Sequence, residues 1–265
     1  MRRRKVGLAL GSGGFRGLTH IGVLKALVAE RIPIDCLAGS SAGAIAAAYF
    51  AVHGEIESLE ELVLRMRRVD LARLIDLISP KKALIRGKKI QRFLDKLFLG
   101  RTFVQLEIPL TIVATDLRTG REIYLTKGQV AEAVMASMTL PGALPPVNIG
   151  KNLLVDGGVV NPTPVDVVKK MGADVVIGVD LTMAGKAYLY DPSIVETLLR
   201  SFEVLRTQTT KLRAGKVGNN LVILKPKING TFNLLYYFDN REIIIKKGEE
   251  AVQKELERIR RTAFR

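Results

Sequence analysis

Short apolar runs of strand length alternate along this chain with longer segments whose apolar residues recur at helical spacing. The strand-like runs cover residues 6–10, 34–38, 110–115, 122–125, 153–155, 174–180 and 221–224. The helix-like segments cover residues 18–31, 44–53, 55–69, 71–78, 88–99, 129–138, 164–171, 193–214 and 249–261. Strands that alternate with helices predict an α/β fold, in which helices cover both faces of a mostly parallel sheet.

The chain contains no internal repeat, low-complexity tract or linker that would divide it. Its 265 residues suit one α/β domain, or at most two small ones, and 48% of them are hydrophobic, so a sizeable core can form. We therefore expect residues 1–265 to fold as a single domain. In this interpretation residues 55–100 are a helical insertion, and residues 181–265 are the C-terminal part of the same domain.

The second strand-like run leads into Gly39-Ser40-Ser41-Ala42-Gly43, and an apolar helical segment follows. A strand, a Gly-x-Ser-x-Gly turn and a helix are the context of a nucleophile elbow. The glycines lie two residues to either side of Ser41, and not of Ser40, so Ser41 is the candidate nucleophile. The following helix should be buried, and its N-terminal end would favour an anion beside the hydroxyl. A small-residue turn without chemistry remains the alternative.

A catalytic serine needs a base, and the two histidines of the chain narrow the choice. In α/β-hydrolases the histidine follows the serine and the acid, late in the chain, but nothing after His53 is histidine. His53 lies at the far end of the helix that follows Ser41, about 18 Å away. His20 falls in the first helical segment, where a packed core residue is the expected role. The base is therefore expected to be a carboxylate.

Asp156 is the best-placed carboxylate. It follows the apolar run 153–155 and precedes Gly157-Gly158, so it should lie where a strand ends and the chain turns. Open α/β sheets place their sites at strand ends. In contact with Ser41, an aspartate would act as general base, and a partly desolvated pocket would increase its basicity. A plain Asp-Gly hairpin turn is the alternative.

A glycine-rich loop, Gly11-Ser12-Gly13-Gly14-Phe15-Arg16-Gly17, joins the first strand to the first helix. Such a loop exposes backbone amides that can bind an oxyanion or a phosphate. The dinucleotide fingerprint fails, because Arg16 occupies its third glycine position and no acidic residue closes the second strand. The P-loop pattern fails as well. We expect the loop to supply an oxyanion hole, and we expect no cofactor.

Together these motifs resemble the patatin-like phospholipase family. The family's Gly-Gly-Gly-x-Arg/Lys-Gly loop matches residues 12–17, with Ser12 in place of the first glycine. Its Gly-x-Ser-x-Gly matches residues 39–43, and its Asp-Gly-Gly/Ala matches residues 156–158. Weaker matches lie at 114–117, 136–137, 140–142 and 161–162. The resemblance covers about residues 5–180, and the last 85 or so residues carry no recognisable family motif.

The resemblance implies a three-layer α/β/α fold and a hydrolase that cleaves lipid acyl esters with a Ser–Asp dyad. Carried over, Ser41 is the nucleophile, Asp156 is the base, and the amides of Gly13 and Gly14 donate to the oxyanion. Arg16 is expected to brace that loop, and Ser12 affects the loop's conformation more than its donors. The remaining motif residues are Gly11, Ser12, Gly17, Gly39, Gly43, Gly157 and Gly158. A non-catalytic lipid- or partner-binding regulator on the same fold is the alternative, and the intact Ser41 and Asp156 argue against it.

Composition narrows the setting. The single cysteine, Cys36, is expected to be a buried, inert thiol, which excludes a disulfide framework and indicates a reducing compartment. No run approaches the roughly 18 apolar residues of a membrane span, and the apolar stretch after the basic first residues is too short for a signal peptide. No His/Cys/Asp cluster has metal-ligand spacing. We expect a cytoplasmic protein without a cleaved leader and without a metal.

The formal net charge of +15 is concentrated in residues 65–101, which hold twelve Lys or Arg against three Asp. Such a field attracts the phosphates of nucleic acid or of anionic lipid. Nucleic acid is disfavoured, because zinc spacing and an aromatic-rich RNP-like strand are missing. The apolar residues between the charges are Leu71, Leu74, Ile75, Leu77, Ile78, Leu84 and Ile85. We expect peripheral contact with an anionic membrane surface, with a merely solvated face as the alternative.

Overall fold

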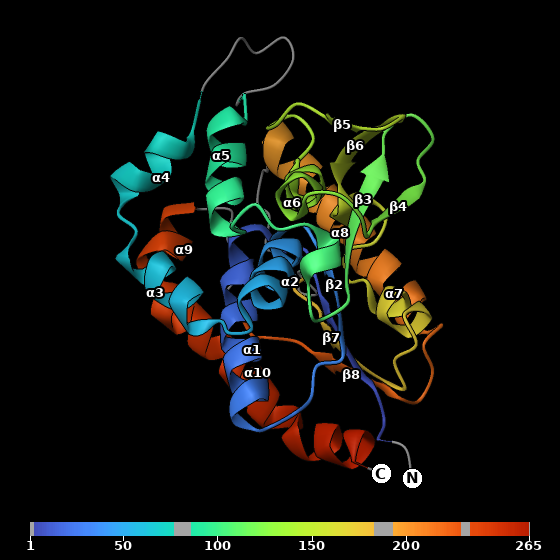
Figure 1. The fold of residues 1–265 in the computed structure, drawn as a ribbon. Helices are drawn as coiled ribbons and strands as arrows, with labels where there is room; N and C mark the ends of the chain where they lie inside the picture. The colour runs from blue at the N-terminus through green and yellow to red at the C-terminus, as the bar shows by residue number, and fades with distance from the viewer. Residues whose placement is uncertain (1–2, 77–85, 183–192, 229–233, 265) are drawn as a thin grey trace.

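The computed structural model describes residues 3–76, 86–182, 193–228 and 234–264, and an eight-stranded sheet lies at the centre of these residues (Figure 1). Parallel pairing joins five strands in the order β3-β2-β1-β7-β8. Their bounds are Val6–Leu10 (β1), Cys36–Ser40 (β2), Leu110–Asp116 (β3), Val175–Val179 (β7) and Leu221–Leu224 (β8). The predicted mostly parallel sheet is confirmed.

Three antiparallel strands complete the sheet around β3: β4 (Glu122–Leu125), β5 (Val147–Ile149) and β6 (Asn152–Asp156). Val113 of β3 pairs with Ser40 of β2 on one side and with β4 on the other. Ala114, the next residue, pairs with Asp156 of β6 and again with β4. Because β4 occupies one edge of β3 from Ile112 to Thr115, β2 and β6 share the opposite edge. The carboxyl ends of β2 and β6 meet there.

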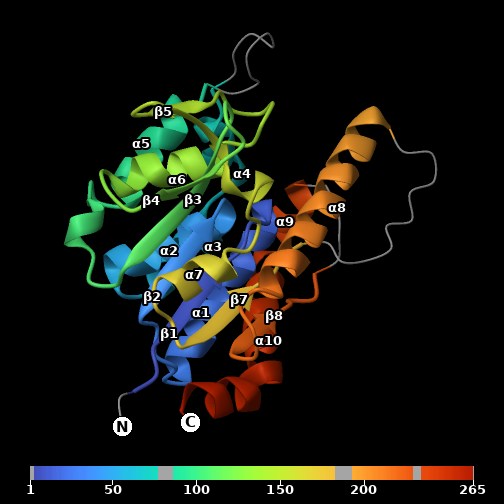
Figure 2. The ribbon, with the colours of Figure 1, turned by 90° about the vertical axis from the view of Figure 1, so that its right-hand side faces the viewer.

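Helices cover both faces of the sheet. On one face lie α1 (Thr19–Ala29), α2 (Ala42–His53), α6 (Val130–Met138) and α10 (Arg241–Ala263). On the other face lie α7 (Val165–Lys170) and α8 (Ile194–Ala214) (Figure 2). The helical region between α2 and β3 contains α3 (Glu57–Arg65), α4 (Arg68–Leu74) and α5 (Lys88–Leu97), and α9 (Leu234–Asp239) precedes α10. Short 3-10 helices occupy Gly14–Leu18 (η1), Phe103–Gln105 (η2) and Gly157–Val159 (η3).

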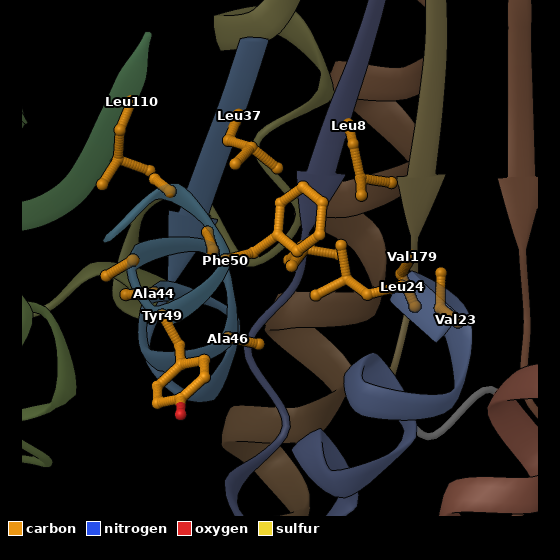
Figure 3. Close-up of a cluster of buried hydrophobic side chains, with 14 of the residues drawn as sticks. Leu8, Val23, Leu24, Leu37, Ala44, Ala46, Tyr49, Phe50, Leu110 and Val179 are labelled. Carbon is orange, nitrogen blue, oxygen red and sulfur yellow. The ribbon is translucent and has the colours of Figure 1, made fainter. Parts of the chain in front are cut away.

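Each central strand supplies two cores, because successive side chains point to opposite faces of a sheet. Leu8 of β1 and Leu37 of β2 point toward α1 and α2, where Phe50 packs against them (Figure 3). The alternate residues Ala9 and Ala38 belong to the second core, which the valines of α7 complete. Small residues on that side let α7 lie close to the strands. The expected three-layer α/β/α fold is confirmed.

Within the helical region 55–100, two expected helices were wrong in their bounds. The segment 55–69 is not one helix, because the backbone turns extended at Met66 and Asp70 caps a new helix by accepting from the Arg67 N–H at 3.0 Å. Arg241 then donates to the carbonyls of Val63 and Met66, both at 2.6 Å, and so satisfies the end of α3. The expected helix 71–78 ends at Leu74. Residues 77–85 lie outside the described part of the chain.

The last helix begins at Arg241, eight residues before the expected start at 249. Tertiary packing explains the difference. A Cβ on Gly248 would overlap the carbonyl oxygen of Thr19, and one on Gly22 would overlap that of Ile245. The backbones of α1 and α10 therefore touch at Gly22 and Gly248. Although glycine in a sequence usually indicates a helix break, Gly248 lets these two helices pack closely. Among the described helices, none has the length and apolarity needed to cross a bilayer.

Substituting Gly248 tests whether the C-terminal part folds with the rest. Alanine ordinarily favours a helix over glycine by about 1 kcal/mol. Here the overlap with Thr19 should reverse that sign and lower the free energy of unfolding by about 1–3 kcal/mol. Calorimetry should show one transition that moves to lower temperature as a whole.

The matched control is Gly215→Ala at the end of α8, where an added Cβ would meet its nearest atom at an ordinary 3.6 Å. This variant should melt like the wild type. Two transitions, of which Gly248→Ala shifts only one, would contradict the single-domain prediction.

Candidate active site

Ser41 occupies the tight turn between β2 and α2, with a left-handed φ of 55° and ψ of −120°. A non-glycine residue in this region is strained and persists only where its surroundings hold it. Its N–H donates to Ser137 Oγ at 2.9 Å, and that hydroxyl donates to the carbonyl of Val113 at 2.6 Å. A Cβ on Gly43 would overlap the Leu10 carbonyl, so only glycine lets α2 start this close to β1. Ser41 therefore lies at a strained turn between a strand and a helix, held by hydrogen bonds and by close backbone contact.

The two strands that end on β3 bring Ser41 and Asp156 into contact. Ser41 Oγ donates to Asp156 Oδ2 at 2.6 Å, and both residues are buried. The other carboxylate oxygen accepts from the Gly158 N–H, also at 2.6 Å. Thr115 donates to the Asp156 carbonyl at 2.8 Å and so ties this residue to β3. The hairpin-turn alternative for Asp156 is wrong, because Asp156 ends β6 and leads into η3.

The surroundings favour a basic carboxylate. Burial raises the pKa of Asp156 above its usual range. The hydrogen bond from Ser41, the positive charge of Arg206 and the Gly158 N–H oppose that rise without cancelling it. A carboxylate whose pKa lies above its ordinary value accepts a proton from a hydroxyl more readily, provided that it remains ionised.

The glycine loop lies beside this pair. The Gly11 N–H donates to Val179 O at 3.1 Å, and Arg16 donates to the Gly13 carbonyl through its backbone N–H at 3.2 Å and through Nε at 3.1 Å. Among the described residues, the N–H groups of Gly13 and Gly14 have no acceptor. Two free backbone amides beside a nucleophile can bind a developing oxyanion.

An apolar cavity of about 580 Å³ opens beside the pair. The predicted site residues in its wall are Gly13, Gly14, Arg16, Gly17, Ser41 and Asp156. The other motif residues, all buried, are Gly11, Ser12, Gly39, Gly43, Gly157 and Gly158. Ile45, Phe93 and Leu97 belong to the apolar part of the wall. A volume of this size fits a small organic ligand or an acyl chain.

Neither histidine contacts Ser41. His20 is fully buried, and its Nε2 donates to the Gly11 carbonyl at 2.7 Å. Burial lowers the pKa of His20 to about 4, although the Gly11 carbonyl favours the charged form, so the ring is neutral at physiological pH. His53 bonds to Leu97 O at 2.9 Å and stacks on Tyr49 with ring centroids 4.1 Å apart. Within the described ranges, no three His, Cys, Asp or Glu side chains gather as metal ligands. Cys36 is a buried thiol, as expected, and burial raises its pKa to about 11.

Sequence reasoning missed two buried ions on α8. Glu203 Oε1 accepts from Arg16 Nη2 and from Arg206 Nη1, both at 2.8 Å. Glu203 and Arg206 are three residues apart and so lie on one helix face. That spacing is the only sequence signal, and it is also common on solvated helices.

Comparison with known proteins agrees with these motifs. The sequence profile of the family described as Patatin-like phospholipase matches residues 8–169. The chain belongs to the patatin-like phospholipase family. Family membership accounts for the order of the glycine loop, the elbow and the Asp-Gly-Gly segment along the chain.

Relatives of this family member are longer than the chain. An uncharacterized NTE family protein of Mycobacterium tuberculosis is 34% identical over 192 residues, covering 72% of this chain and 53% of that protein. The patatin-like phospholipase domain-containing protein 6 of Mus musculus is 35% identical over 182 residues, covering 66% of this chain and 13% of that protein. The chain thus spans about half the length of the mycobacterial relatives. The crystal structure of VipD from Legionella pneumophila shares the fold, with a TM-score of 0.65, 13% identity and coverage of 97% and 67% of the two chains.

The neutral, buried His20 should make stability depend on pH. In the unfolded chain His20 takes up a proton near pH 6.5, whereas in the fold it does so only near pH 4. The unfolded state therefore binds more protons between these values, and the free energy of unfolding should fall as pH drops through this window. At about 1.4 kcal/mol for each pH unit, the loss reaches about 3 kcal/mol.

Chemical denaturation of the His20→Gln variant at several pH values checks this expectation. The glutamine amide can still donate to the Gly11 carbonyl but does not titrate, so this part of the pH dependence should vanish. A His53→Gln variant should keep it. Equal pH dependence in the wild type and His20→Gln would contradict the prediction.

Proposed function

We propose that this chain is a serine hydrolase that cleaves lipid acyl esters through an acyl-enzyme on Ser41. The observation that carries the proposal is the 2.6 Å hydrogen bond from Ser41 Oγ to Asp156, in the wall of an apolar cavity. Membership of the patatin-like phospholipase family supports the lipid class of substrate. A serine that only formed a turn would need neither a buried carboxylate on its hydroxyl nor a cavity.

The reaction follows from the positions of these groups. Asp156 accepts the Ser41 proton as Oγ attacks the ester carbonyl, and the amides of Gly13 and Gly14 donate to the oxyanion that forms. Asp156 then passes the proton to the departing alcohol, which leaves an acyl group on Ser41. In the second half, Asp156 takes a proton from water, the resulting nucleophile attacks the acyl-enzyme, and the proton returns to Ser41 Oγ as the carboxylic acid leaves.

The cavity wall favours an acyl chain over a polar substrate. Apart from the residues of the glycine loop and the dyad, its wall is made mainly of aliphatic and aromatic side chains from α2, α3, α5 and α8. Each methylene that leaves water for such a wall stabilises the complex by about 0.8 kcal/mol. Binding energy of this kind should therefore increase with the length of the acyl chain until the cavity is full.

Ser41→Ala and Asp156→Asn should each abolish ester hydrolysis, because nucleophile and base act as one unit. We expect each loss to approach that of the double variant, on the order of 10⁴- to 10⁶-fold. Hydrolysis rates on esters of several chain lengths measure the activity, and labelling by a fluorophosphonate probe measures the reactivity of Ser41. Chelation of divalent cations should leave the rate unchanged.

His20→Gln and His53→Gln are the matched controls, and they should keep most of the activity. A folded His20→Gln variant as inactive as Ser41→Ala would overturn the dyad. A wild-type protein that binds lipid vesicles but neither reacts with the probe nor hydrolyses any ester would instead be a non-catalytic lipid-binding protein.

We also propose that the basic region docks the enzyme on anionic membrane surfaces. The proposal rests on α5, which has two different faces. Phe93 and Leu97 line the cavity, while Lys88, Lys89 and Arg92 are exposed. A membrane held by these charges would lie next to the cavity that receives the lipid.

Other charges of the basic region contribute less to this proposal. Arg67 and Arg73 pair with Asp70, and Arg68 pairs with Asp239, so these charges are partly neutralised. Of the other residues expected to take part in docking, Lys81, Lys82, Leu77, Ile78, Leu84 and Ile85 lie outside the described residues.

Reversing Lys88, Lys89 and Arg92 to Glu should weaken binding to anionic vesicles. Each basic residue near an anionic leaflet contributes about 1 kcal/mol to binding, so the affinity measured by co-sedimentation should fall about 100-fold or more. High salt should weaken wild-type binding in the same way, because the Debye length shrinks to about 3 Å at 1 M. Hydrolysis of a soluble short-chain ester should not change.

The control reverses three exposed residues of α10, Lys246, Lys254 and Arg261, which changes the net charge by the same amount. This variant should bind anionic vesicles nearly as well as the wild type does. Equal losses in both triple variants would mean that net charge, and not the α5 face, determines binding.

A further inference from the structure

Arg206 is a buried cation next to the candidate dyad. It projects from α8, is 7% exposed, and donates through Nη1 to Glu203 Oε1 at 2.8 Å and through Nη2 to Ser12 Oγ. Removing a guanidinium from water is costly unless it gains partners of opposite charge or good hydrogen bonds. A helix that only covered the sheet would not need this residue.

Ser12 connects Arg206 to two segments of the site. Its hydroxyl accepts from Arg206 and donates to the Pro162 carbonyl at 3.2 Å, and its N–H donates to the same carbonyl at 2.7 Å. Pro162 belongs to the segment that follows Asp156. The serine at the family's first glycine position therefore joins α8, the glycine loop and the aspartate segment. A glycine there would have no hydroxyl for Arg206 to bind.

Gly158 shows how close this junction lies to the base. A Cβ on Gly158 would be 2.6 Å from Ser12 Oγ and 2.9 Å from Asp156 Oδ1. The Ser12 hydroxyl and the Asp156 carboxylate thus contact one backbone position. A shift of the glycine loop would therefore also displace the Asp156 carboxylate, which accepts from Ser41.

Charge balance gives Arg206 a second effect. The buried cluster holds two guanidinium groups, Arg16 and Arg206, and two carboxylates, Glu203 and Asp156. Glu203 is shared by both arginines, and the positive charge of Arg206 lowers the pKa of Asp156 against the effect of burial. Without that charge, Asp156 would hold its proton to higher pH, and as long as it held that proton it could not accept one from Ser41.

Other titratable and charged groups lie around this cluster. They are Asp180 after β7, whose charge acts on Arg206, His20 of α1, bonded to Gly11, and Asp116 at the end of β3, bonded to the Leu153 N–H. In the described part of the chain none of these three bonds to Asp156, whereas Arg206 acts on it through its charge and contacts its segment through Ser12.

We propose that Arg206 is a positioning residue of this hydrolase, which clamps the glycine loop to the aspartate segment through Ser12 and supplies the positive charge beside Asp156. The proposal rests on the proposed Ser41–Asp156 function. It assigns a role in catalysis to a helix beyond the part of the chain that matches the family profile, which ends at residue 169.

Three substitutions separate the two effects. Arg206→Met removes the charge and the donors, Arg206→Lys keeps the charge, and Ser12→Gly removes the hydroxymethyl side chain that Arg206 binds but leaves Arg206 itself unchanged. The readout is the rate at which Ser41 reacts with a fluorophosphonate, measured from pH 4 to 9, together with kcat/KM on a short-chain ester. Arg206→Met should move the acidic limb of both profiles up by about one pH unit or more, and Arg206→Lys should return it most of the way. Ser12→Gly should lower the rate about tenfold at all pH values without moving the limb.

Arg213→Met is the matched control. Arg213 lies on the same helix and pairs with Glu122 and Asp166 at 3.0 and 2.7 Å, away from the dyad. Its loss should leave the limb in place. A folded Arg206→Met variant with an unshifted limb overturns the charge effect.

Ser12→Gly restores the family's residue, and it tests the contact between Ser12 and Arg206 even if Arg206→Met does not fold. A Ser12→Gly variant with the wild-type rate overturns the clamp. The Ser41→Ala variant distinguishes a failure of the proposed role of Arg206 and Ser12 from a failure of the proposed hydrolase function. Labelling that persists in Ser41→Ala refutes the dyad, whereas labelling that needs Ser41 but ignores Arg206 and Ser12 refutes only the present inference.

Discussion

The candidate site depends on the point at which two strands end on β3. β2 runs parallel to β3 and ends at Ser40, opposite Val113, while β6 runs antiparallel and ends at Asp156, opposite Ala114. These partners are consecutive residues, so the two strand ends meet on one edge of a buried strand. Ser41 follows β2 and Asp156 ends β6, so the sheet holds these two side chains together. Rigid strands and helices position reacting groups more precisely than loops do.

Two kinds of side chain line the cavity beside that junction. Apolar residues of α2, α3, α5 and α8 make up most of its wall, and the glycine loop, Asp156, Glu203 and Arg206 supply its polar part. Each of these buried charges has an opposite charge or a strong donor nearby, which is the condition under which ions remain buried. Burial in this apolar surrounding raises the pKa of Asp156, so in the proposed function the binding of an acyl chain and the strength of the base have one cause.

The fold and most of the site could be predicted from local pattern. The strand Val6–Leu10 is apolar throughout and was expected with its observed bounds, and Ser41 and Asp156 were found through the glycines around them. The start of α10 could not be found this way, because the close contact of Gly248 with α1 is visible only in three dimensions. For Ser12, the departure from the family pattern was visible, but its partner Arg206 lies 194 residues further along the chain.

The family profile and the sheet have different limits. The profile ends at residue 169, inside α7, yet β7 pairs along the whole of β1 and accepts from the Gly11 N–H of the glycine loop. The segment that the profile matches is therefore shorter than the segment that must fold together. The end of the profile is thus no structural boundary, because a fragment cut there would leave β1 without the strand that pairs with its whole length on one side.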